Sequence, residues 1–296
     1  MGHAGHSHVS EDSSRLRLAL LITATLLIAE VVGGILSNSI ALLADAGHML
    51  TDVAALGLSL FVAWFAHLPR TSHRTYGYLR WEILAALING VTLLLLSAWI
   101  IWESLSRFKD PEPVTGGTML LVAVLGLIAN IAAARVLHPA SESSLNVRGA
   151  YLHVLGDLLA SVGTVAAGVT IWATGWLAAD PLASLFTTAL IIRGAWNLVR
   201  ESVDVLLESA PAHCPPGAVR AQLEAIPGIE SVHDLHIWSV SSGMVAMSAH
   251  AVVREPKRHQ HVLEHIHDAM RLFGIEHVTV QLERHSMAER EKHPHQ

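Results

Sequence analysis

The sequence predicts an α-helical membrane protein with six transmembrane helices, followed by a small α+β domain in the cytosol. Its 296 residues are 52% hydrophobic and only 15% charged, whereas soluble domains carry about 25% charged residues. The deficit of charge falls almost wholly before residue 200. That part contains six apolar stretches, each long enough to cross a bilayer, which takes about 20 residues. From about residue 208 the composition becomes that of a soluble domain.

Short turn-forming segments separate the predicted spans. Asn38, between two serines, separates the first two spans, and Asp180-Pro181 marks the start of the sixth; such residues favour turns over helix interiors. The first and fifth breaks are very short, so those helix pairs are predicted to be hairpins. The spans lie near residues 16–36, 40–66, 82–103, 114–137, 148–174 and 178–199, within a transmembrane domain over residues 15–207.

Arginines predict the orientation of the spans. Arg70, Arg74 and Arg80 lie between the second and third spans, and Arg135 and Arg148 lie at the connection of the fourth to the fifth. Basic residues are enriched in cytoplasmic loops, so both termini are expected in the cytoplasm. Residues 1–14, which include three histidines, are expected to form a disordered cytosolic tail.

A small α+β domain is predicted over residues 208–286, followed by a C-terminal tail over 287–296. A helical run, AVRAQLEAI, precedes two strand-like runs, VHDLHIWSV and MVAMSAHAVV. A helical pattern over 257–273 then precedes a last strand, HVTVQLER. This order predicts a small sheet with helices on one face. About 80 residues close only a modest core, so dimerisation would help the domain.

The composition argues against several functional classes. The net charge of −6 is mild and mixed, which gives no case for nucleic-acid binding. The one cysteine, Cys214, allows neither an intrachain disulfide nor a thiolate zinc cluster. No His-Glu-x-x-His run marks a metalloprotease, and the chain is not expected to be an enzyme. Histidine is unusually frequent, with 20 copies, and this surplus favours a function in binding or moving metal ions or protons.

Two matched pairs of ionisable side chains lie inside predicted spans. His48 and Asp52 in the second span are four residues apart, and His153 and Asp157 repeat this spacing in the fifth. Residues four apart share one face of a helix. Ionisable residues cost about 2.5–3.5 kcal/mol in a span, so they usually serve function. For one such pair alone, a hydrogen bond to a neighbouring helix is an equally good interpretation.

The four side chains together suit a zinc ion. Two imidazoles and two carboxylates match tetrahedral Zn²⁺, and the carboxylates cancel the charge of an ion held away from water. Mg²⁺ and Ca²⁺ prefer six or more oxygens, whereas Co²⁺ or Cd²⁺ could also fit. Asp45, three residues before His48, could line the pore or cap backbone groups.

This ligand set predicts a carrier rather than a channel. A channel needs a weak, passable site, which a closed shell of four ligands does not offer. Metal ligands must be deprotonated to bind, so protons and metal compete for the same lone pairs. That competition is sufficient for an exchange of metal for protons.

Five segments carry a family resemblance that covers nearly the whole chain: SNSIALLADAGHMLTD, RTYGYLRWEILAALING, RGAYLHVLGD, ADPLASL and VHDLHIWSV. They resemble the cation diffusion facilitator family, most closely its bacterial cobalt–zinc–cadmium efflux branch. The resemblance implies a homodimer, metal/proton antiport, a ferredoxin-like cytosolic domain, and a transport site at the two His/Asp pairs. The short connection between the fourth and fifth spans favours an exporter of the bacterial plasma (inner) membrane.

The cytosolic domain offers a set of candidate ligands for regulatory zinc. They are His233, His250, His277, Glu283 and His261. By resemblance, Glu283 replaces an aspartate and Gln281 replaces a histidine. The resemblance also implies that His277 compensates for the missing histidine, as a histidine in that region does in other branches. His261 shares a helical face with His265. Solvation of exposed histidines is the alternative.

Two further features follow from the resemblance. Arg80 and Glu208 match positions of a charge lock between helices, although a solvated pair worth about 0–1 kcal/mol is an equal alternative. A loop that holds metal ligands in some relatives has Arg74, Tyr78 and Leu79 at those positions. That loop is therefore not expected to bind metal tightly.

Overall fold

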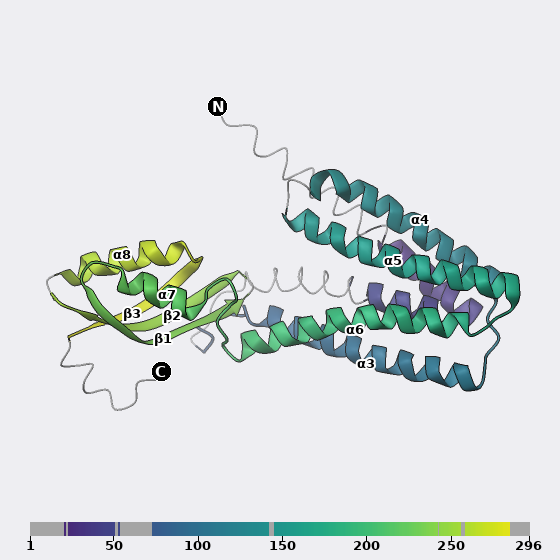
Figure 1. The fold of residues 1–296 in the computed structure, drawn as a ribbon, viewed down its shortest axis with the longest axis horizontal. Coiled ribbons are helices and arrows are strands. Elements are labelled where there is room, and N and C mark those ends of the chain that lie inside the picture. The colour runs from purple at the N-terminus through teal and green to yellow at the C-terminus, as the bar shows by residue number, and fades with distance from the viewer. Residues whose placement is uncertain are drawn as a thin grey trace. The chain divides into compact units, whose positions relative to one another are not determined.

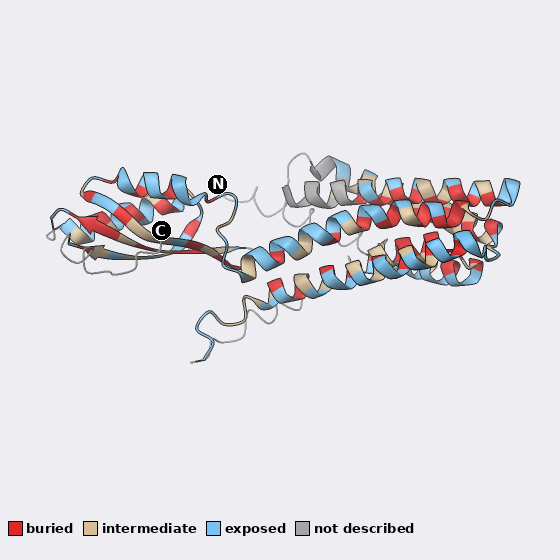
Figure 2. Cartoon of the chain, turned by 60° about the horizontal axis from the view of Figure 1, so that its bottom comes forward, coloured by how far each residue is buried: buried red, intermediate tan, exposed pale blue. Residues whose placement is uncertain are grey.

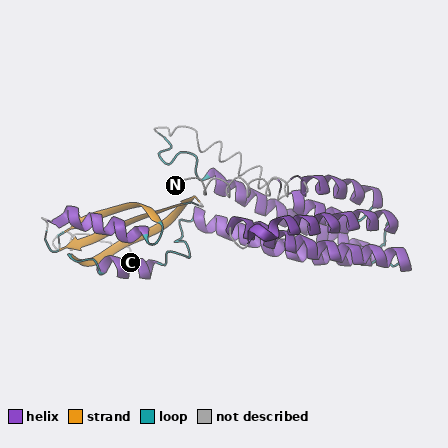
Figure 3. Cartoon of the chain, turned by 90° about the horizontal axis from the view of Figure 1, so that it is seen from above, coloured by secondary structure: helices purple, strands orange, loops and turns teal. Residues whose placement is uncertain are grey.

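The computed structural model describes residues 21, 23–50, 53, 73–141, 145–241, 243–255 and 258–284, without the side chains of 137, 139–150, 152 and 153. The chain divides into two compact units, Met1–Leu58 with Ile88–Leu198, and Ser59–Leu87 with Val199–Gln296. Within the described residues, the first unit is helical and the sheet belongs to the second (Figure 1, Figure 3). The predicted tails, 1–14 and 287–296, lie outside the described residues.

Six apolar helices of the described chain correspond to the six predicted spans. Four are long enough to cross a membrane: α3 (Trp81–Lys109), α4 (Gly116–Ser141), α5 (Leu145–Thr174) and α6 (Ala179–Leu206). Two shorter helices, Thr23–Ser37 and Ile40–Leu50, precede them. Residues 54–66 of the second predicted span are outside the described residues. The helical membrane architecture is thus confirmed.

Two helices extend further than their apolar stretches. α3 ends at Lys109 and α6 at Leu206, whereas the sequence predicted ends near 103 and 199. The additional turns carry charged residues such as Arg107 and Asp204, which are tolerated in a helix outside lipid. Hydropathy marks where a helix leaves the apolar layer, and backbone hydrogen bonding continues beyond that point.

The membrane helices bury polar and small residues and expose large apolar ones. Trp102 and Trp172 are among the exposed side chains, and exposed positions run along the outer side of each helix (Figure 2). Between α4 and α5, Asn130 Nδ2 donates a buried hydrogen bond of 2.9 Å to Ser161 Oγ. A Cβ at Gly168 would lie 3.1 Å from Leu120 Cα, so a glycine permits this close approach.

The cytosolic domain has the predicted order of elements. These are α7 (Pro216–Glu224), β1 (Ile229–Ser241), β2 (Met244–Val253), α8 (His259–Arg271) and β3 (Ile275–Glu283). The strands form a sheet in the order β1-β2-β3. β1 pairs antiparallel with β2, and β2 pairs parallel with β3 through the α8 crossover.

Both helices of this domain pack on the same face of the sheet. Val219 of α7 and Ile266 of α8 share one buried cluster with Met247 of β2, which confirms the predicted arrangement. Successive strand residues point to opposite faces, so His250 of β2 points away from the helices. Cys214 is buried, and burial raises the pKa of its thiol, which keeps the sulfur protonated.

Candidate metal centres

The helix Ile40–Leu50 and α5 bring two of the predicted transport ligands together. His48 Nε2 lies 3.3 Å from Asp157 Oδ1, and both side chains are largely shielded from solvent. Zinc bonds of about 2.0–2.1 Å put two ligands of a tetrahedral ion about 3.3–3.4 Å apart. The observed separation therefore suits two ligands on one zinc ion, and it joins helices that lie more than 100 residues apart in sequence.

The other two predicted ligands are not described as side chains. Asp52 lies outside the described residues, and His153 is described in α5 without its side chain. Their convergence with His48 and Asp157 therefore stays a prediction. The spacing supports it, because His153 precedes Asp157 by one helical turn.

Two more buried acids lie in the same unit. Asp45, expected at the pore or at a cap, is buried. Glu30, in the helix Thr23–Ser37, is also buried, although the sequence analysis did not predict it as a functional residue. Glu30 Oε1 would lie 2.8 Å from a Cβ at Gly126, so this carboxylate packs closely against α4. Glu30 is an ionisable residue inside a predicted span, and that position alone was the signal that could have identified it as a functional residue.

Asp180 of α6 holds the start of the helix that carries His48. Its fully buried carboxylate accepts hydrogen bonds from Ser39 Oγ at 2.5 Å, from the Ile40 amide at 2.9 Å and from the Ala41 amide at 3.2 Å. These amides are among the unpaired donors of a helix N-terminus, and a negative charge is favourable there. Asp180 thus caps a neighbouring helix from a distance of about 140 residues in sequence.

Arg107 of α3 adds a cation beside this cap. It donates to the Asn38 carbonyl oxygen at 2.6 Å and to Asn38 Oδ1 at 3.1 Å. Asn38 has a positive φ of 55°, a conformation that asparagine tolerates in turns. Arg107 also pairs with Glu103 and Glu112, each at 3.2 Å. The turn before the His48 helix is therefore fixed from two neighbouring helices.

Three predicted regulatory ligands meet in the cytosolic domain, and we call them the sheet cluster: His233, His250 and Glu283. Their ligand atoms all lie within 4.8 Å of one another. His233 of β1 pairs with His250 of β2, and Glu283 of β3 pairs with Val252 of β2. The sheet register thus places three potential zinc ligands on the face without helices.

The carboxylate of Glu283 lies between the two imidazoles of the sheet cluster. Glu283 Oε1 is 2.9 Å from His250 Nδ1, and Glu283 Oε2 is 3.5 Å from His233 Nε2. Gln281, also on β3, donates a hydrogen bond of 2.6 Å from its Nε2 to Glu283 Oε1. Gln281 thus contacts the candidate ligand Glu283, and hydrogen bonds of this kind orient metal-binding carboxylates.

A bulge in β1 brings one more carboxylate close. Asp234 has a positive φ of 49°, and the register shifts between His233 and His236. Asp234 Oδ1 is 3.0 Å from His236 Nε2, and its Oδ2 is 3.8 Å from His250 Nε2. The bulge re-aims side chains beside the cluster, as bulges often do at functional sites.

The last two predicted regulatory ligands lie elsewhere in the structure. His261 is on α8, with its ring centroid 4.2 Å from that of His265. His277 is on β3, and its ring centroid lies 5.7 Å from that of Tyr76. Among the described residues, neither belongs to the sheet cluster. Their role as ligands stays a prediction.

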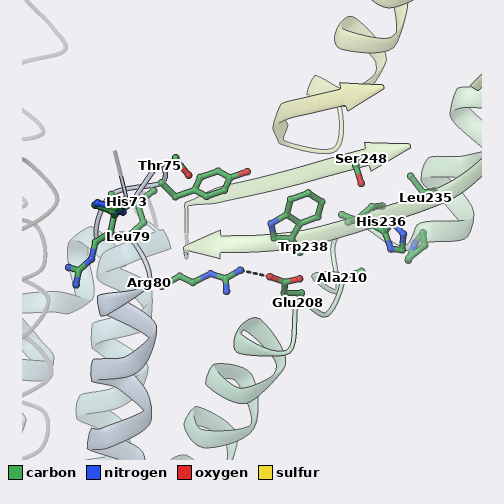
Figure 4. Close-up of a pocket in the computed structure, with 15 residues that line it drawn as sticks. His73, Thr75, Leu79, Arg80, Glu208, Ala210, Leu235, His236, Trp238 and Ser248 are labelled. Carbon is green, nitrogen blue, oxygen red and sulfur yellow. Dashed lines mark hydrogen bonds and ion pairs between the residues drawn. The ribbon is translucent and has the colours of Figure 1, made fainter. Parts of the chain in front are cut away.

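Arg80 and Glu208 make the predicted contact at the ends of α3 and α6. Arg80 donates to Glu208 Oε1 at 2.8 Å, and both side chains are substantially exposed. The pair borders a cavity of about 790 Å³ between the loop 73–80 and β1 (Figure 4). In that loop, the Arg74 guanidinium lies 4.6 Å above the Tyr78 ring. This distance is that of a cation–π contact within the loop.

Both parts of the chain match known families. A profile described as "Cation efflux transmembrane domain" matches residues 16–207, and "Cation efflux protein, cytoplasmic domain" matches residues 216–285. "Zinc transporter ZitB" of Pectobacterium atrosepticum is 46% identical over 96% of this chain and 89% of its own length.

Two further relatives show a similar extent of likeness. The "Cadmium, cobalt and zinc/H(+)-K(+) antiporter" of Bacillus subtilis is 39% identical over 94% of this chain and 92% of its own length. "Metal cation efflux system protein CzcD" of Cupriavidus metallidurans is 40% identical over 95% of this chain and 90% of its own length. The likeness therefore spans the membrane and cytosolic parts together.

Proposed function

Because this chain belongs to the cation efflux family, whose members transport metal ions and are not enzymes, we propose that it exports zinc from the cytoplasm in exchange for protons. The transport site consists of His48, Asp52, His153 and Asp157. The observation that carries the proposal is the 3.3 Å approach of His48 Nε2 to Asp157 Oδ1 from two separate helices.

The donor atoms define the class of ion. Two nitrogens and two carboxylate oxygens favour a tetrahedral divalent ion of borderline softness, foremost zinc. Two carboxylates balance the charge of the ion in a medium where an isolated charge is costly. Cobalt and cadmium share this chemistry, and relatives named for cadmium, cobalt and zinc support them as further substrates.

The same side chains account for proton exchange. Zinc needs the lone pairs of deprotonated ligands. When the site opens to a more acidic outer side, protons occupy those lone pairs and the ion is released. When it opens to the cytoplasm, proton loss restores the ligands. Asp180 and Arg107 fix the start of the helix that carries His48, so His48 keeps its position along this helix relative to α6 during the transport cycle.

The cytosolic domain supplies regulation in this proposal. The sheet cluster, with His233, His250 and Glu283, binds zinc when its cytosolic concentration rises and thereby stimulates transport. The chain acts as a homodimer in the bacterial inner membrane with both termini in the cytoplasm. The matched profile of the cytosolic domain, which is one of dimerisation, supports this assembly.

Proteoliposomes with an imposed pH gradient test the exchange. Zinc uptake and proton movement are recorded together with two fluorescent indicators, one for each ion. We expect zinc entry to accelerate with the gradient, protons to move in the opposite direction, and both signals to stop when a protonophore collapses the gradient. Zinc entry that continues unchanged after the collapse rules out proton exchange.

A further inference from the structure

The exposed side of α6 changes from apolar to basic towards the C-terminal end of this helix. Three exposed apolar side chains, Leu182, Phe186 and Leu190, lie along that side at helical spacing. Four exposed side chains with hydrogen-bond donors continue the same side, and we call them the α6 basic face: Arg193, Trp196, Asn197 and Arg200. A charged side chain in an apolar span is costly unless it finds a partner.

Arg193 lies inside the apolar layer, near its cytoplasmic edge. It is about 21 Å along the helix axis from Ala179, the first residue of α6, and the apolar layer is about 30 Å thick. Trp176, exposed just before this helix, marks the outer boundary, as tryptophan does at membrane interfaces. Arg200 lies about 10 Å further along α6, which places it among the lipid headgroups. A long arginine side chain at position 193 reaches the same layer.

Both arginines keep hydrogen-bond donors for an external anion. Arg193 forms no ion pair with the residues that the structure describes. Arg200 Nε lies 3.9 Å from Asp204 Oδ2, which is too far for a hydrogen bond, and both of these side chains are exposed. A guanidinium group binds a phosphate through two parallel N–H donors, so phosphate is the anion that best matches this face.

A second copy of this chain is a poor partner for the α6 basic face. A two-fold axis through this face would bring the same arginines of both copies together, and like charges repel strongly where the dielectric is low. A phospholipid offers the complementary chemistry. Its phosphate lies at the depth of the two guanidinium groups, and its acyl chains meet the apolar part of the same helix side, which ends at Leu190.

We propose that the α6 basic face binds one anionic phospholipid of the cytoplasmic leaflet, with the lipid phosphate between the guanidinium groups of Arg193 and Arg200. Trp196 and Asn197 supply neutral N–H donors to the headgroup. The bound lipid fixes the depth of α6, which leads into the domain matched by the cytoplasmic profile. This site depends neither on the proposed transport site nor on the sheet cluster.

Native mass spectrometry of the full-length protein in detergent with added lipid tests this site, because it resolves each bound lipid by mass and reports the number of subunits. We expect the first phosphatidylglycerol to bind at least about tenfold more tightly than the first phosphatidylcholine, whose phosphate is neutralised by its own headgroup. Arg193→Gln and Arg200→Gln should each lower the affinity for phosphatidylglycerol about fivefold, the effect of one basic side chain at a membrane surface.

The chain supplies matched controls for the charge and for its place. Arg193→Lys keeps a positive charge and should retain most of the affinity, and Arg220→Gln, at an exposed position of α7, should retain all of it. Glycerol 3-phosphate carries the phosphate without acyl chains, and it should not displace the lipid.

Four results overturn the proposal. The first is equal affinity for the two lipids, and the second is wild-type affinity for phosphatidylglycerol in Arg193→Gln. The third is displacement of the lipid by glycerol 3-phosphate, which would identify a site for soluble phosphate. The fourth is a changed number of subunits in Arg193→Gln, which would identify this face as a subunit interface.

Discussion

Glu283 is the residue on which the sheet cluster depends. It is almost fully buried, and its two oxygens face one histidine each, at 2.9 Å and 3.5 Å. A buried carboxylate is costly without a cation, and a zinc ion between these three side chains would remove that cost. The oxygen toward His233 has no hydrogen bond within the described residues. Glu283 thus favours metal binding on physical grounds.

Replacing this carboxylate by an amide should weaken zinc binding. Glu283→Gln keeps the size of the side chain but removes its negative charge and one lone-pair donor. We expect the tightest phase of a calorimetric zinc titration to lose at least about tenfold in affinity. Glu276→Gln, at an exposed position of the same strand, is the matched control. Equal titration curves for the two variants contradict the role of Glu283.

Single residues were predictable where local spacing carried the signal. The interval of four residues predicted His48 and Asp157 as ligands, and the structure places these two side chains 3.3 Å apart. Glu30 was missed because it has no partner at that spacing, although an acid in a span is itself informative. The positive φ of Asp234 was not predictable, because the bulge depends on the register between two strands.

At the scale of elements, the helix Ile40–Leu50 begins where another helix caps it. Asp180 satisfies two of its first amides. The segment ADPLASL was recognised only as a point of resemblance, since a cap supplied from 140 residues away leaves no local pattern. Helix existence was predictable from hydropathy, whereas the charged ends of α3 and α6 were not.

Removing the charge of this cap should destabilise the protein. In Asp180→Asn an amide group replaces an oxygen that accepts a buried backbone N–H. We expect a loss of about 1–3 kcal/mol, the cost of an unsatisfied buried donor, measured by thermal unfolding in detergent. Asp204→Asn, at an exposed site of the same helix, should change stability by much less. An unchanged unfolding temperature for Asp180→Asn would show that the cap is dispensable.

The contact of α4 with α5 allows a second test at this scale. A methyl group at position 168 would press on the backbone of Leu120 at 3.1 Å. We expect Gly168→Ala to destabilise the protein by about 1–3 kcal/mol, as overpacking does. Gly194→Ala, where an added Cβ meets nothing within 4 Å, should be neutral or stabilising. Unfolding measurements that rank the two variants in reverse order contradict the close packing.

At the scale of the whole molecule, the membrane part and the cytosolic domain differ in what they bury, because one faces lipid and the other faces water. The helices of the first unit expose large apolar side chains, which suits lipid, and the cytosolic domain closes its own core around β2 and α8. Composition therefore predicted the two parts and their fold classes. Side-chain convergence between distant helices could only be inferred from matched spacing. The four-ligand transport site rests on that inference for Asp52 and His153.

Zinc flux through the Asp157→Asn variant tests the central claim most directly. The initial rate of zinc uptake is measured in proteoliposomes under a fixed pH gradient, beside wild type and Asp204→Asn, at equal protein incorporation. Because the variant loses a charged ligand of the proposed transport site, its uptake should fall to the rate of protein-free vesicles, while Asp204→Asn should retain the wild-type rate. Uptake by Asp157→Asn at the wild-type rate would contradict a zinc site between these helices.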